Sequence, residues 1–142
     1  MNLSNTAEYA IRILTFMAVK NLDIYTAKYL IEKLNISDKY LRRIMTQLTK
    51  AGLIRSIQGR DGGYVFNEKP ENIDLMQIID AVDDMDKYMG CILGFKECSD
   101  SNPCALHKQW SKIRDQIFDM FKRTNLLEVS EDMFLKLEKI KF

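Results

Sequence analysis

The sequence predicts a mainly α-helical protein with a small β-hairpin: a winged helix-turn-helix domain followed by a long dimerisation helix. Three observations support this fold class. Three helical patterns of apolar residues precede two short apolar strands, a glycine-rich tip separates the strands, and a heptad-like apolar stripe follows residue 102. The length of 142 residues suits a single domain.

Two of the first three helices are expected to begin at a residue that can cap them. Ser4 precedes the first helix, which ends at Asn21, and Thr26 begins the second. Ser37 caps the third helix, which Gly52 closes. The short gap over residues 35–37 suits the tight turn of a helix-turn-helix motif. The third helix has an apolar stripe with i, i+3, i+4, i+7 spacing, made of Leu41, Ile44, Met45 and Leu48.

The predicted hairpin consists of strands over residues 53–57 and 64–66. Gly59, Gly62 and Gly63 mark its tip, where we expect positive φ angles. After the hairpin, Asp74 is the expected cap of a fourth helix, with Gln77 in capping-box spacing. Three helices followed by a hairpin predict a winged helix-turn-helix domain over residues 1–82.

The rest of the chain is predicted to form a sensor loop and two helices. Residues 83–102 lose helical periodicity, and loops of about 20 residues are usually functional. Asn102 and Pro103 predict the start of a long helix that runs to about Thr124. Ser130 is the expected cap of a last helix to about Ile140, so that residues 103–142 form a dimerisation segment. A second copy of the chain is the simplest partner for the apolar stripe of the long helix, which contains Leu106, Trp110, Ile113, Ile117 and Met120.

Charge is unevenly distributed along the chain. Residues 1–70 carry 11 basic and 6 acidic side chains, whereas residues 71–142 carry 10 and 14. A basic half is typical of a protein that holds an anionic partner, with nucleic acid the leading candidate. The sequence shows neither an apolar run of membrane-spanning length nor the pattern of a secretory signal, so we expect a cytoplasmic protein without a membrane partner.

The third helix and the hairpin tip form the first candidate site. Polar and basic side chains lie in the first two turns of this helix, off its apolar stripe, where an α-helix can enter the DNA major groove. Two further polar side chains at the tip can reach a minor groove or a phosphate. A solvated basic face is the alternative interpretation. The predicted DNA-binding residues are Ser37, Lys39, Tyr40, Arg42, Arg43, Gln58 and Arg60.

The second candidate site is the spacing C-x6-C-x5-C-x2-H, formed by Cys91, Cys98, Cys104 and His107. An odd, clustered set of cysteines favours metal, cluster or reactive-thiol chemistry over a disulfide framework. Thiolates on a mobile loop can hold an iron–sulfur cluster, and three thiolates with one imidazole also suit tetrahedral zinc. Cys104 is expected near the second position of the long helix, where the helix dipole lowers a thiol pKa.

An enzyme is the alternative from another class, with Cys104 as a redox thiol. The sequence has one histidine and lacks a C-x2-C pair, a Walker loop and a G-x-S-x-G motif. The glycine-rich segment GRDGGY lies between two strands rather than before a helix, which disfavours phosphate binding. We therefore predict that the protein is not an enzyme.

Five segments occur in an order that resembles one known family: MNLSNTAEYAIRIL, ISDKYLRRIMTQLTKAGLI, GRDGGY, IDLMQIIDAVD and the cysteine loop. Over about residues 1–125 they resemble the Rrf family of bacterial winged-helix transcription regulators. The resemblance implies a homodimer that binds a palindromic double-stranded DNA operator, with Lys39, Arg42 and Arg43 at base-reading positions. Gln58 stands where the family usually has a wing arginine, so insertion into the minor groove would depend on Arg60.

The resemblance also implies an iron–sulfur cluster, 2Fe–2S or 4Fe–4S, held by Cys91, Cys98 and Cys104. Their first gap has six residues where the family has five, which leaves the cluster type open. The fourth ligand would be His107 or, donated across the dimer, Glu8. The expected function is that of a transcription regulator, expected to be a repressor, whose operator binding responds to redox state, nitric oxide or cluster status. A thiol- or zinc-based sensor without iron is the alternative.

Overall fold

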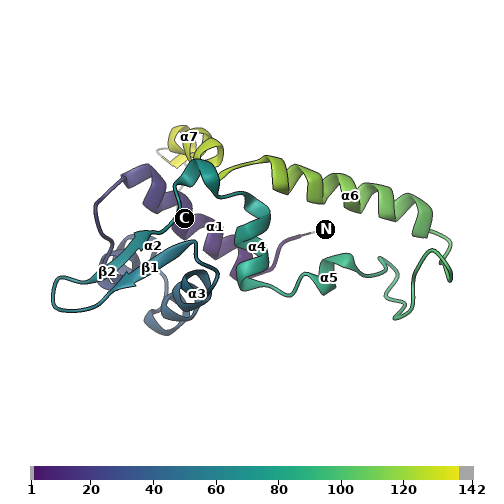
Figure 1. Cartoon of the computed structure of the whole chain (residues 1–142), viewed down its shortest axis with the longest axis horizontal. Coiled ribbons are helices and arrows are strands. Elements are labelled where there is room, and N and C mark those ends of the chain that lie inside the picture. Colours follow the sequence, from purple (N-terminus) through teal and green to yellow (C-terminus); the bar gives the residue numbers. More distant parts are fainter. Residues whose placement is uncertain (1, 138–142) are drawn as a thin grey trace.

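The computed structural model describes the backbone of residues 2–137 and the side chains of residues 2–132. It confirms a mainly helical fold with one antiparallel hairpin (Figure 1). In chain order, its elements are α1 (Asn5–Lys20), α2 (Ala27–Leu34), α3 (Asp38–Lys50), β1 (Ile54–Ile57), β2 (Gly63–Phe66), the short 3-10 helix η1 (Pro70–Asn72), α4 (Leu75–Val82), α5 (Asp86–Met89), α6 (His107–Arg123) and α7 (Leu126–Leu137). The predicted end of the last helix near Ile140 lies outside the described residues.

Side-chain caps begin the first three helices; the sequence predicts the caps of α1 and α3, and for α2 the structure shows that Thr26 is the cap rather than the first helical residue. The hydroxyls of Ser4, Thr26 and Ser37 each accept a hydrogen bond from a first-turn backbone N–H of α1, α2 and α3, respectively. Asn21 ends α1 in the left-handed conformation that the cap requires. The cap of α3 is one residue earlier than expected, because Ala51 occupies the C-cap and Gly52 follows it with φ 79°.

The hairpin has the expected position but a different tip. β1 pairs with β2 so that Ile57 lies opposite Gly63. Positive φ was expected at all three tip glycines, but within this tip only Gly59 adopts it, at 106°. Position 62 needs glycine for a different reason: the backbone of Ile57 lies so close that a Cβ on residue 62 would be 2.1 Å from the Ile57 carbonyl oxygen. A Cβ on Gly63 would lie 2.6 Å from the carbonyl oxygen of Tyr25, which pairs with the neighbouring Tyr64.

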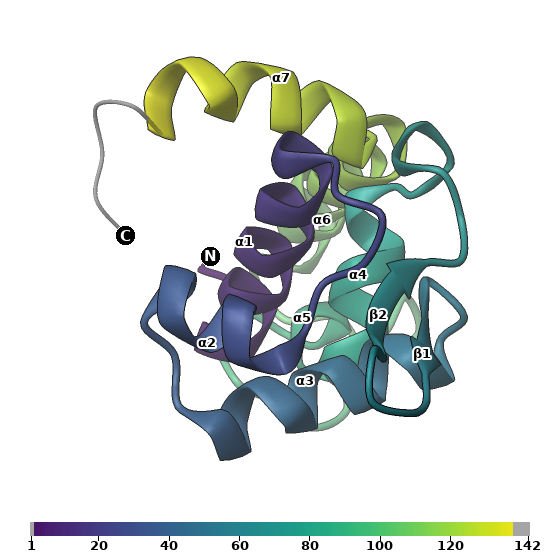
Figure 2. The same cartoon turned by 90° about the vertical axis from the view of Figure 1, so that its left-hand side faces the viewer.

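The hydrophobic core lies in the N-terminal body, around α1. α1 packs against α3, α4 and α7, as the two orthogonal views show (Figures 1 and 2). The fully buried side chains of α1, α3 and α4 supply a large part of this core: Ala7, Ala10, Ile13, Leu14, Met17, Leu41, Ile44, Met45, Leu48 and Ile78. In contrast, α6 projects from the body as an arm, with the cysteine segment at its far end (Figure 1).

The segment before α6 differs from the prediction. The expected loop over residues 83–102 contains the short helix α5, and the long helix begins at His107 rather than at Pro103. Asn102 does not act as an N-cap, because its backbone exchanges two hydrogen bonds with Ser99 and its side-chain amide donates to the carbonyl of Glu97. α6 therefore has 17 residues and is about 26 Å long rather than about 30 Å.

The predicted start of the last helix at Ser130 is wrong. α7 begins at Leu126, because Asn125 and Glu128 form a capping box at its start. The backbone N–H of Glu128 donates to the Asn125 side chain at 2.9 Å, and the backbone N–H of Asn125 donates to the Glu128 carboxylate at 3.2 Å. Ser130 is buried inside the helix and donates to the carbonyl of Leu126 at 2.6 Å. Within the described chain, none of the helices has the length and apolar character needed to cross a membrane.

Candidate functional site

The predicted DNA-binding side chains of α3 lie opposite its buried stripe, with one exception. Ser37, Lys39, Arg42 and Arg43 are exposed. α3 lies along the lower edge of the body, next to the hairpin (Figure 2). This arrangement gives the body a surface with an exposed, largely basic helix beside a β-hairpin, which matches the geometry that a helix-turn-helix needs to enter a groove.

Tyr40 is the exception, since it is half-buried against α1. Its hydroxyl forms a 3.0 Å hydrogen bond with the hydroxyl of Thr6, and its ring meets the ring of Tyr9 edge-on, with 5.4 Å between centroids. The guanidinium of Arg43 lies 5.3 Å from the centroid of the Tyr40 ring. Tyr40 thus joins α3 to α1 and holds one face of Arg43.

Arg42 is engaged within its own helix. Its guanidinium forms an ion pair with Asp38, one turn earlier. The hydrogen bond that Arg42 donates to Asp38 and the negative charge of this carboxylate raise the pKa of Arg42, so that this side chain is fully charged. Both groups are well exposed, so the pair can exchange for a DNA contact at little cost.

The hairpin tip presents the two remaining candidates. Gln58 and Arg60 are both exposed. The Gln58 amide donates to the hydroxyl of Ser56 at 3.2 Å, which directs it back along β1. Arg60 lies on the turn that Gly59 and Gly62 make possible.

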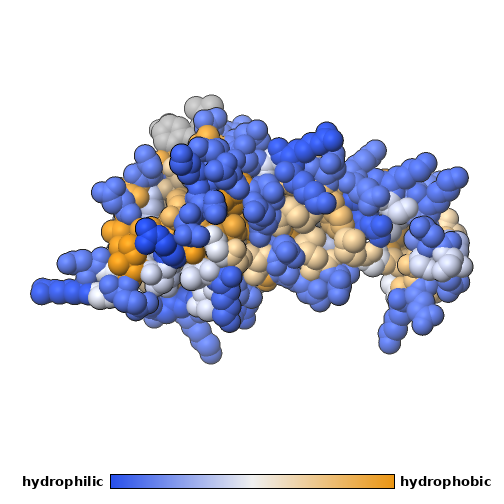
Figure 3. All heavy atoms as spheres, viewed as in Figure 1, coloured by the Kyte–Doolittle hydropathy of each residue, from blue (hydrophilic) through white to orange (hydrophobic). Residues whose placement is uncertain are grey.

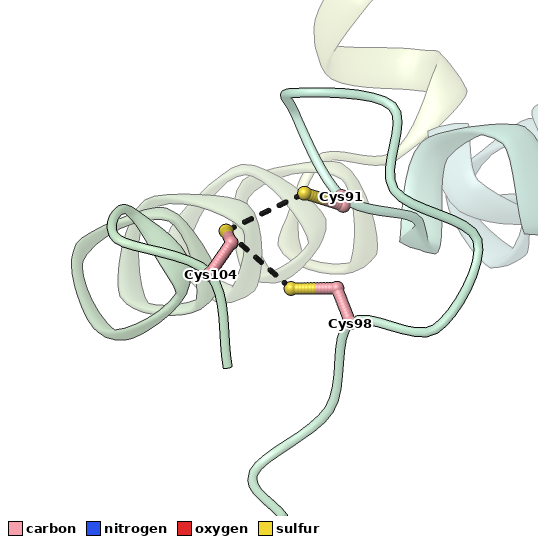
Figure 4. A group of neighbouring side chains, drawn as sticks. All are labelled: Cys91, Cys98 and Cys104. Carbon is pink, nitrogen blue, oxygen red and sulfur yellow. Dashed lines mark hydrogen bonds between the residues drawn. The ribbon is translucent and has the colours of Figure 1, made fainter. Parts of the chain in front are cut away.

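The three cysteines come together at the root of α6. Cys91 follows α5, Cys98 lies in the middle of the connecting segment, and Cys104 lies in the turn before α6 (Figure 4). The Sγ of Cys104 is 3.5 Å from the Sγ of Cys91 and 3.5 Å from that of Cys98. All three sulfur atoms lie within 4.8 Å of one another. The sequence spacing therefore forms one compact group of half-buried thiols.

His107, the first residue of α6, extends this group. Its Nδ1 is 3.1 Å from the Sγ of Cys98, and its Nε2 is 2.9 Å from a carboxylate oxygen of Asp100. Such a carboxylate orients an imidazole and fixes its tautomer. Glu8, the alternative ligand, lies in the first turn of α1. It is not a member of the group that the three sulfur atoms form among the described side chains.

The thiols differ in acidity. Burial raises the pKa of Cys91, but backbone N–H donors from Phe95 and Leu93 and hydrogen bonds with the other two thiols outweigh it and lower this pKa to about 7. At Cys98, the backbone N–H of Cys104 favours the thiolate, but burial and the neighbouring sulfur atoms prevail and raise the pKa. Cys104 precedes the helix instead of occupying its second position, so the expected dipole argument does not hold there.

Two side chains of α6 hold the cysteine segment in place, a role that the sequence did not indicate. The indole Nε1 of Trp110 donates to the carbonyl of Gly90 at 3.0 Å, and a guanidinium nitrogen of Arg114 donates to the carbonyl of Met89 at 2.7 Å. The backbone just before Cys91 is thus fixed to α6, close to where Cys104 enters the helix.

A polar network that the sequence did not indicate links the same segment to α1. The Asp83 carboxylate, whose side chain is 8% exposed, accepts hydrogen bonds from the hydroxyls of Ser4, at 2.7 Å, and Tyr88. Lys87 forms an ion pair with it at 2.5 Å, and the N–H of Ser4 donates to the Tyr88 hydroxyl at 3.1 Å. Burial raises the pKa of Asp83, but the hydrogen bonds from Lys87, Tyr88 and Ser4 outweigh it and lower this pKa.

The arm also carries an exposed apolar stripe. Leu106, Ile113 and Met120 are 39%, 50% and 54% exposed and repeat every seven residues, so they lie on one side of α6. The other two residues of the predicted stripe, Trp110 and Ile117, are half-buried against the rest of the chain. Figure 3 shows apolar surface along the arm beneath the polar outer side of α6.

The matches to known proteins agree with this arrangement. Residues 3–132 match the profile of Rrf2, described as an iron-dependent transcriptional regulator. The chain belongs to the Rrf2 family. The match covers both the winged helix-turn-helix body and the arm with its cysteines.

Individual Rrf2-family relatives match nearly the whole chain. A putative HTH-type transcriptional regulator from Aquifex aeolicus is 30% identical over 131 residues, or 91% of each chain. The regulator NsrR from Bacillus licheniformis is 28% identical over 141 residues, covering 96% of this chain and 99% of NsrR. The structure of CymR, the global cysteine regulator of Bacillus subtilis, has a TM-score of 0.74 at 27% identity and covers 92% of this chain and 97% of CymR.

These relatives confirm two predictions of the sequence. The Rrf2-family chain is an HTH-type, DNA-binding transcription regulator, and it is not an enzyme. The winged-helix fold class is confirmed as well. Among the described residues, the three thiols form the one group of Cys, His, Asp or Glu side chains that lie close enough together to hold a metal ion.

Proposed function

We propose that the protein is a homodimeric repressor whose operator binding is modulated by an iron–sulfur cluster bound to Cys91, Cys98 and Cys104. The convergence of the three sulfur atoms at the root of α6 is the observation that carries this proposal. Thiolates are the usual ligands of such clusters, and the family profile that matches the chain is described as iron-dependent. When bound, a cluster would supply a redox-active group that can change charge or be lost.

His107 is the proposed fourth ligand. Its Nδ1 faces Cys98, and Asp100 holds the other ring nitrogen, which is the orientation that a ligating histidine needs. Glu8 is the alternative and would have to come from the second subunit. A His107→Ala variant and a Glu8→Ala variant separate these assignments, because only the loss of a true ligand should change the absorption spectrum of the loaded protein.

The proposed DNA interface combines α3 and the hairpin tip. Lys39, Arg42 and Arg43 would contact base edges in the major groove, and the capping Ser37 would contact a phosphate. Arg60 and Gln58 would reach the neighbouring minor groove or its phosphates. Tyr40 would contribute indirectly, by holding Arg43 between α3 and the DNA.

The two sites would be coupled through contacts on both sides of the thiol group. Trp110 and Arg114 join the backbone before Cys91 to α6, and Asp83 joins the preceding segment to Ser4 at the start of α1. A change at the thiols would therefore alter the position of α6 or of the body. In a dimer crossed by α6, either change shifts the spacing of the two α3 helices, which must match half-sites about one DNA turn apart.

Anaerobic purification with iron supplied tests the cluster. We expect a coloured protein with visible absorbance and with iron and sulfide in comparable amounts. Ala at Cys91, Cys98 or Cys104 should abolish the colour, whereas the control Ser101→Ala, on the same segment, should retain it. A colourless anaerobic wild-type protein rejects the cluster.

Zinc without iron is a second candidate, and one observation favours it. Thiolates that share a tetrahedral zinc ion lie about 3.8 Å apart, given zinc–sulfur bonds of about 2.3 Å. The two separations of 3.5 Å from Cys104 are close to that value. Metal analysis of the same anaerobic preparation distinguishes one zinc per chain from iron with sulfide.

Two arginine variants test the DNA interface. Arg43→Ala should relax the preference for the operator by about 1–3 kcal/mol at one base position, since a base-edge contact is lost. Arg60→Ala should weaken binding to all sequences alike and reduce its salt dependence. If neither variant alters binding in titrations of operator and unrelated duplexes, this assignment of the DNA-contacting surface is wrong.

A further inference from the structure

Cys104 holds a central position among the three thiols. Its Sγ makes both of the 3.5 Å sulfur contacts, one to Cys91 and one to Cys98 (Figure 4). A disulfide bond is about 2.05 Å long, so a shift of about 1.5 Å would bring either pair into bonding distance. All three thiols lie on or beside the segment between α5 and α6, where side chains can rotate without disturbing the core.

The surrounding contacts distinguish the two pairs. Cys98 is engaged by His107, whose Nδ1 lies 3.1 Å from its sulfur. The backbone next to Cys91 is fixed to α6 by Trp110, and Cys104 enters the same helix three residues before its first turn. The backbone beside Cys91 and Cys104 is therefore fixed at α6 while neither thiol has an imidazole partner, whereas the Cys98 thiol itself is engaged by the His107 imidazole.

We propose that the metal-free protein forms an intramolecular disulfide between Cys91 and Cys104, with Cys98 left as a thiol beside His107. The proposal rests on the proposed function for its regulatory meaning, because the bond consumes two of the three sulfur ligands. Metal loading and this disulfide exclude each other, whichever metal the site takes. The oxidised chain would have its cysteine segment covalently closed onto the root of α6.

The oxidant is a hydroperoxide such as hydrogen peroxide. The thiolate of Cys91 attacks one peroxide oxygen, which breaks the O–O bond, forms a sulfenic acid and releases hydroxide that takes up a proton to become water. The thiol of Cys104 then attacks the sulfenic sulfur, forms the S–S bond and releases a second molecule of water. Two thiols lose two electrons and two protons, and one peroxide is reduced to two waters.

Tryptic mapping of the full chain identifies the bond, because the cleavage sites separate the candidates. Cleavage after Lys87, Lys96 and Lys108 places Cys91 in peptide 88–96 and both other cysteines in peptide 97–108. Chelator-treated protein is oxidised with hydrogen peroxide, blocked with iodoacetamide and digested without reductant. We expect the two peptides to be joined, with the alkyl group on Cys98, and the undigested chain to run as a monomer on a non-reducing gel.

Variants make the result decisive. Cys98→Ser should keep the joined peptides, whereas Cys91→Ser and Cys104→Ser should lose them. A disulfide confined to peptide 97–108, a bond between Cys91 and Cys98, a bond between chains, or three free thiols after oxidation would each overturn the proposal. The proposed function can fail independently of this disulfide. If the anaerobic protein is colourless but still forms the disulfide, only the iron–sulfur cluster is rejected. If the anaerobic protein is coloured but its metal-free form does not form the disulfide, only the disulfide is rejected.

Discussion

Asp83 connects the segment before the cysteines to the start of α1 through side-chain hydrogen bonds. Its carboxylate accepts hydrogen bonds from Ser4, which also caps α1, and from Tyr88 of α5. A largely buried carboxylate is tolerated only because these donors and Lys87 compensate for its lost hydration. One side chain thus fixes the start of α1 to the beginning of the cysteine segment.

Asp83→Asn should destabilise the protein. The amide cannot form an ion pair with Lys87 and places an N–H group toward donors, so we expect a loss of about 1–3 kcal/mol in unfolding free energy at pH 7, measured by urea denaturation. The control Asp80→Asn changes an exposed carboxylate on α4 and should shift stability by less than about 0.5 kcal/mol. Equal effects of the two variants would contradict the role of the network.

The pH dependence of that loss follows from the lowered pKa of Asp83. A carboxyl group whose pKa falls on folding stabilises the protein above its unfolded value, about 3.9, and this contribution disappears as the pH falls through the lower folded value. The difference between wild type and Asp83→Asn should therefore be largest near neutral pH and shrink below about pH 4. Denaturation curves at several pH values measure it, and a difference that grows toward acid pH would contradict the assignment.

The sequence predicted which thiols and imidazole come together, but not all contacts of the candidate site residues. The spacing C-x6-C-x5-C-x2-H was sufficient to predict that three thiols and an imidazole converge. Tyr40 was grouped with the exposed side chains of α3, because helical spacing does not show that α1 offers Thr6 and Tyr9 to it. The Asp83 network was missed because Ser4 lies about 80 positions from Asp83 and Tyr88 in the chain.

The elements were predictable wherever the deciding interaction is local. The caps at Ser4, Thr26 and Ser37 involve a hydroxyl and an N–H three residues later, so the local sequence indicated where these three helices start. The start of α6 was misplaced because Asn102-Pro103 has the composition of a helix start, while the pairing of Asn102 with Ser99 decides otherwise. For α7 a readable signal existed, since Asn125 and Glu128 have capping-box spacing.

The hairpin depends on a glycine that has no positive φ. Gly62→Ala would place a Cβ 2.1 Å from the carbonyl oxygen of Ile57, and the backbone there cannot yield without changing the turn. We expect a destabilisation of about 1–3 kcal/mol in thermal unfolding, together with shifted amide resonances around the tip. Gly90→Ala is the matched control, because its Cβ would lie no closer than 3.7 Å to the Asp86 carbonyl, and it should unfold like the wild type.

The contact between α5 and α6 can be weakened without removing a ring. Trp110→Phe deletes the indole N–H that donates to the carbonyl of Gly90 but keeps an aromatic side chain. Without this hydrogen bond the segment should lose about 1 kcal/mol of local stability. Amide hydrogen exchange in residues 90–104 should then be about 5-fold faster, with exchange in the body unchanged. Gln109→Ala, at the exposed neighbouring position, should leave exchange in this segment as it is. Uniform acceleration over the whole chain would instead indicate global destabilisation.

The whole molecule consists of a packed body and an arm that is only partly covered. The predicted stripe of α6 divides into two sets, since Trp110 and Ile117 contact their own chain, whereas Leu106, Ile113 and Met120 remain exposed. The sequence predicted an apolar stripe of heptad spacing but not this division. Which residues of the stripe are covered depends on how α6 packs against α4 and the segment around α5. The three exposed side chains repeat every seven residues, the spacing of a helix that packs along a second helix.

Ile113 lies at the centre of this exposed set, so Ile113→Glu tests whether a second copy covers it. In a dimer packed along α6, an unpaired carboxylate at this position would lose its hydration, and a cost of about 3 kcal/mol weakens dimerisation by about 100-fold. Sedimentation equilibrium measures that change, with unchanged helix content by circular dichroism as evidence that the fold is intact. Lys112→Glu introduces the same side chain one residue away, off the exposed set, and should leave the dimer as it is. Dimers of equal strength in both variants would mean that another surface joins the subunits, and a shift in α6 could then no longer set the spacing of the two α3 helices.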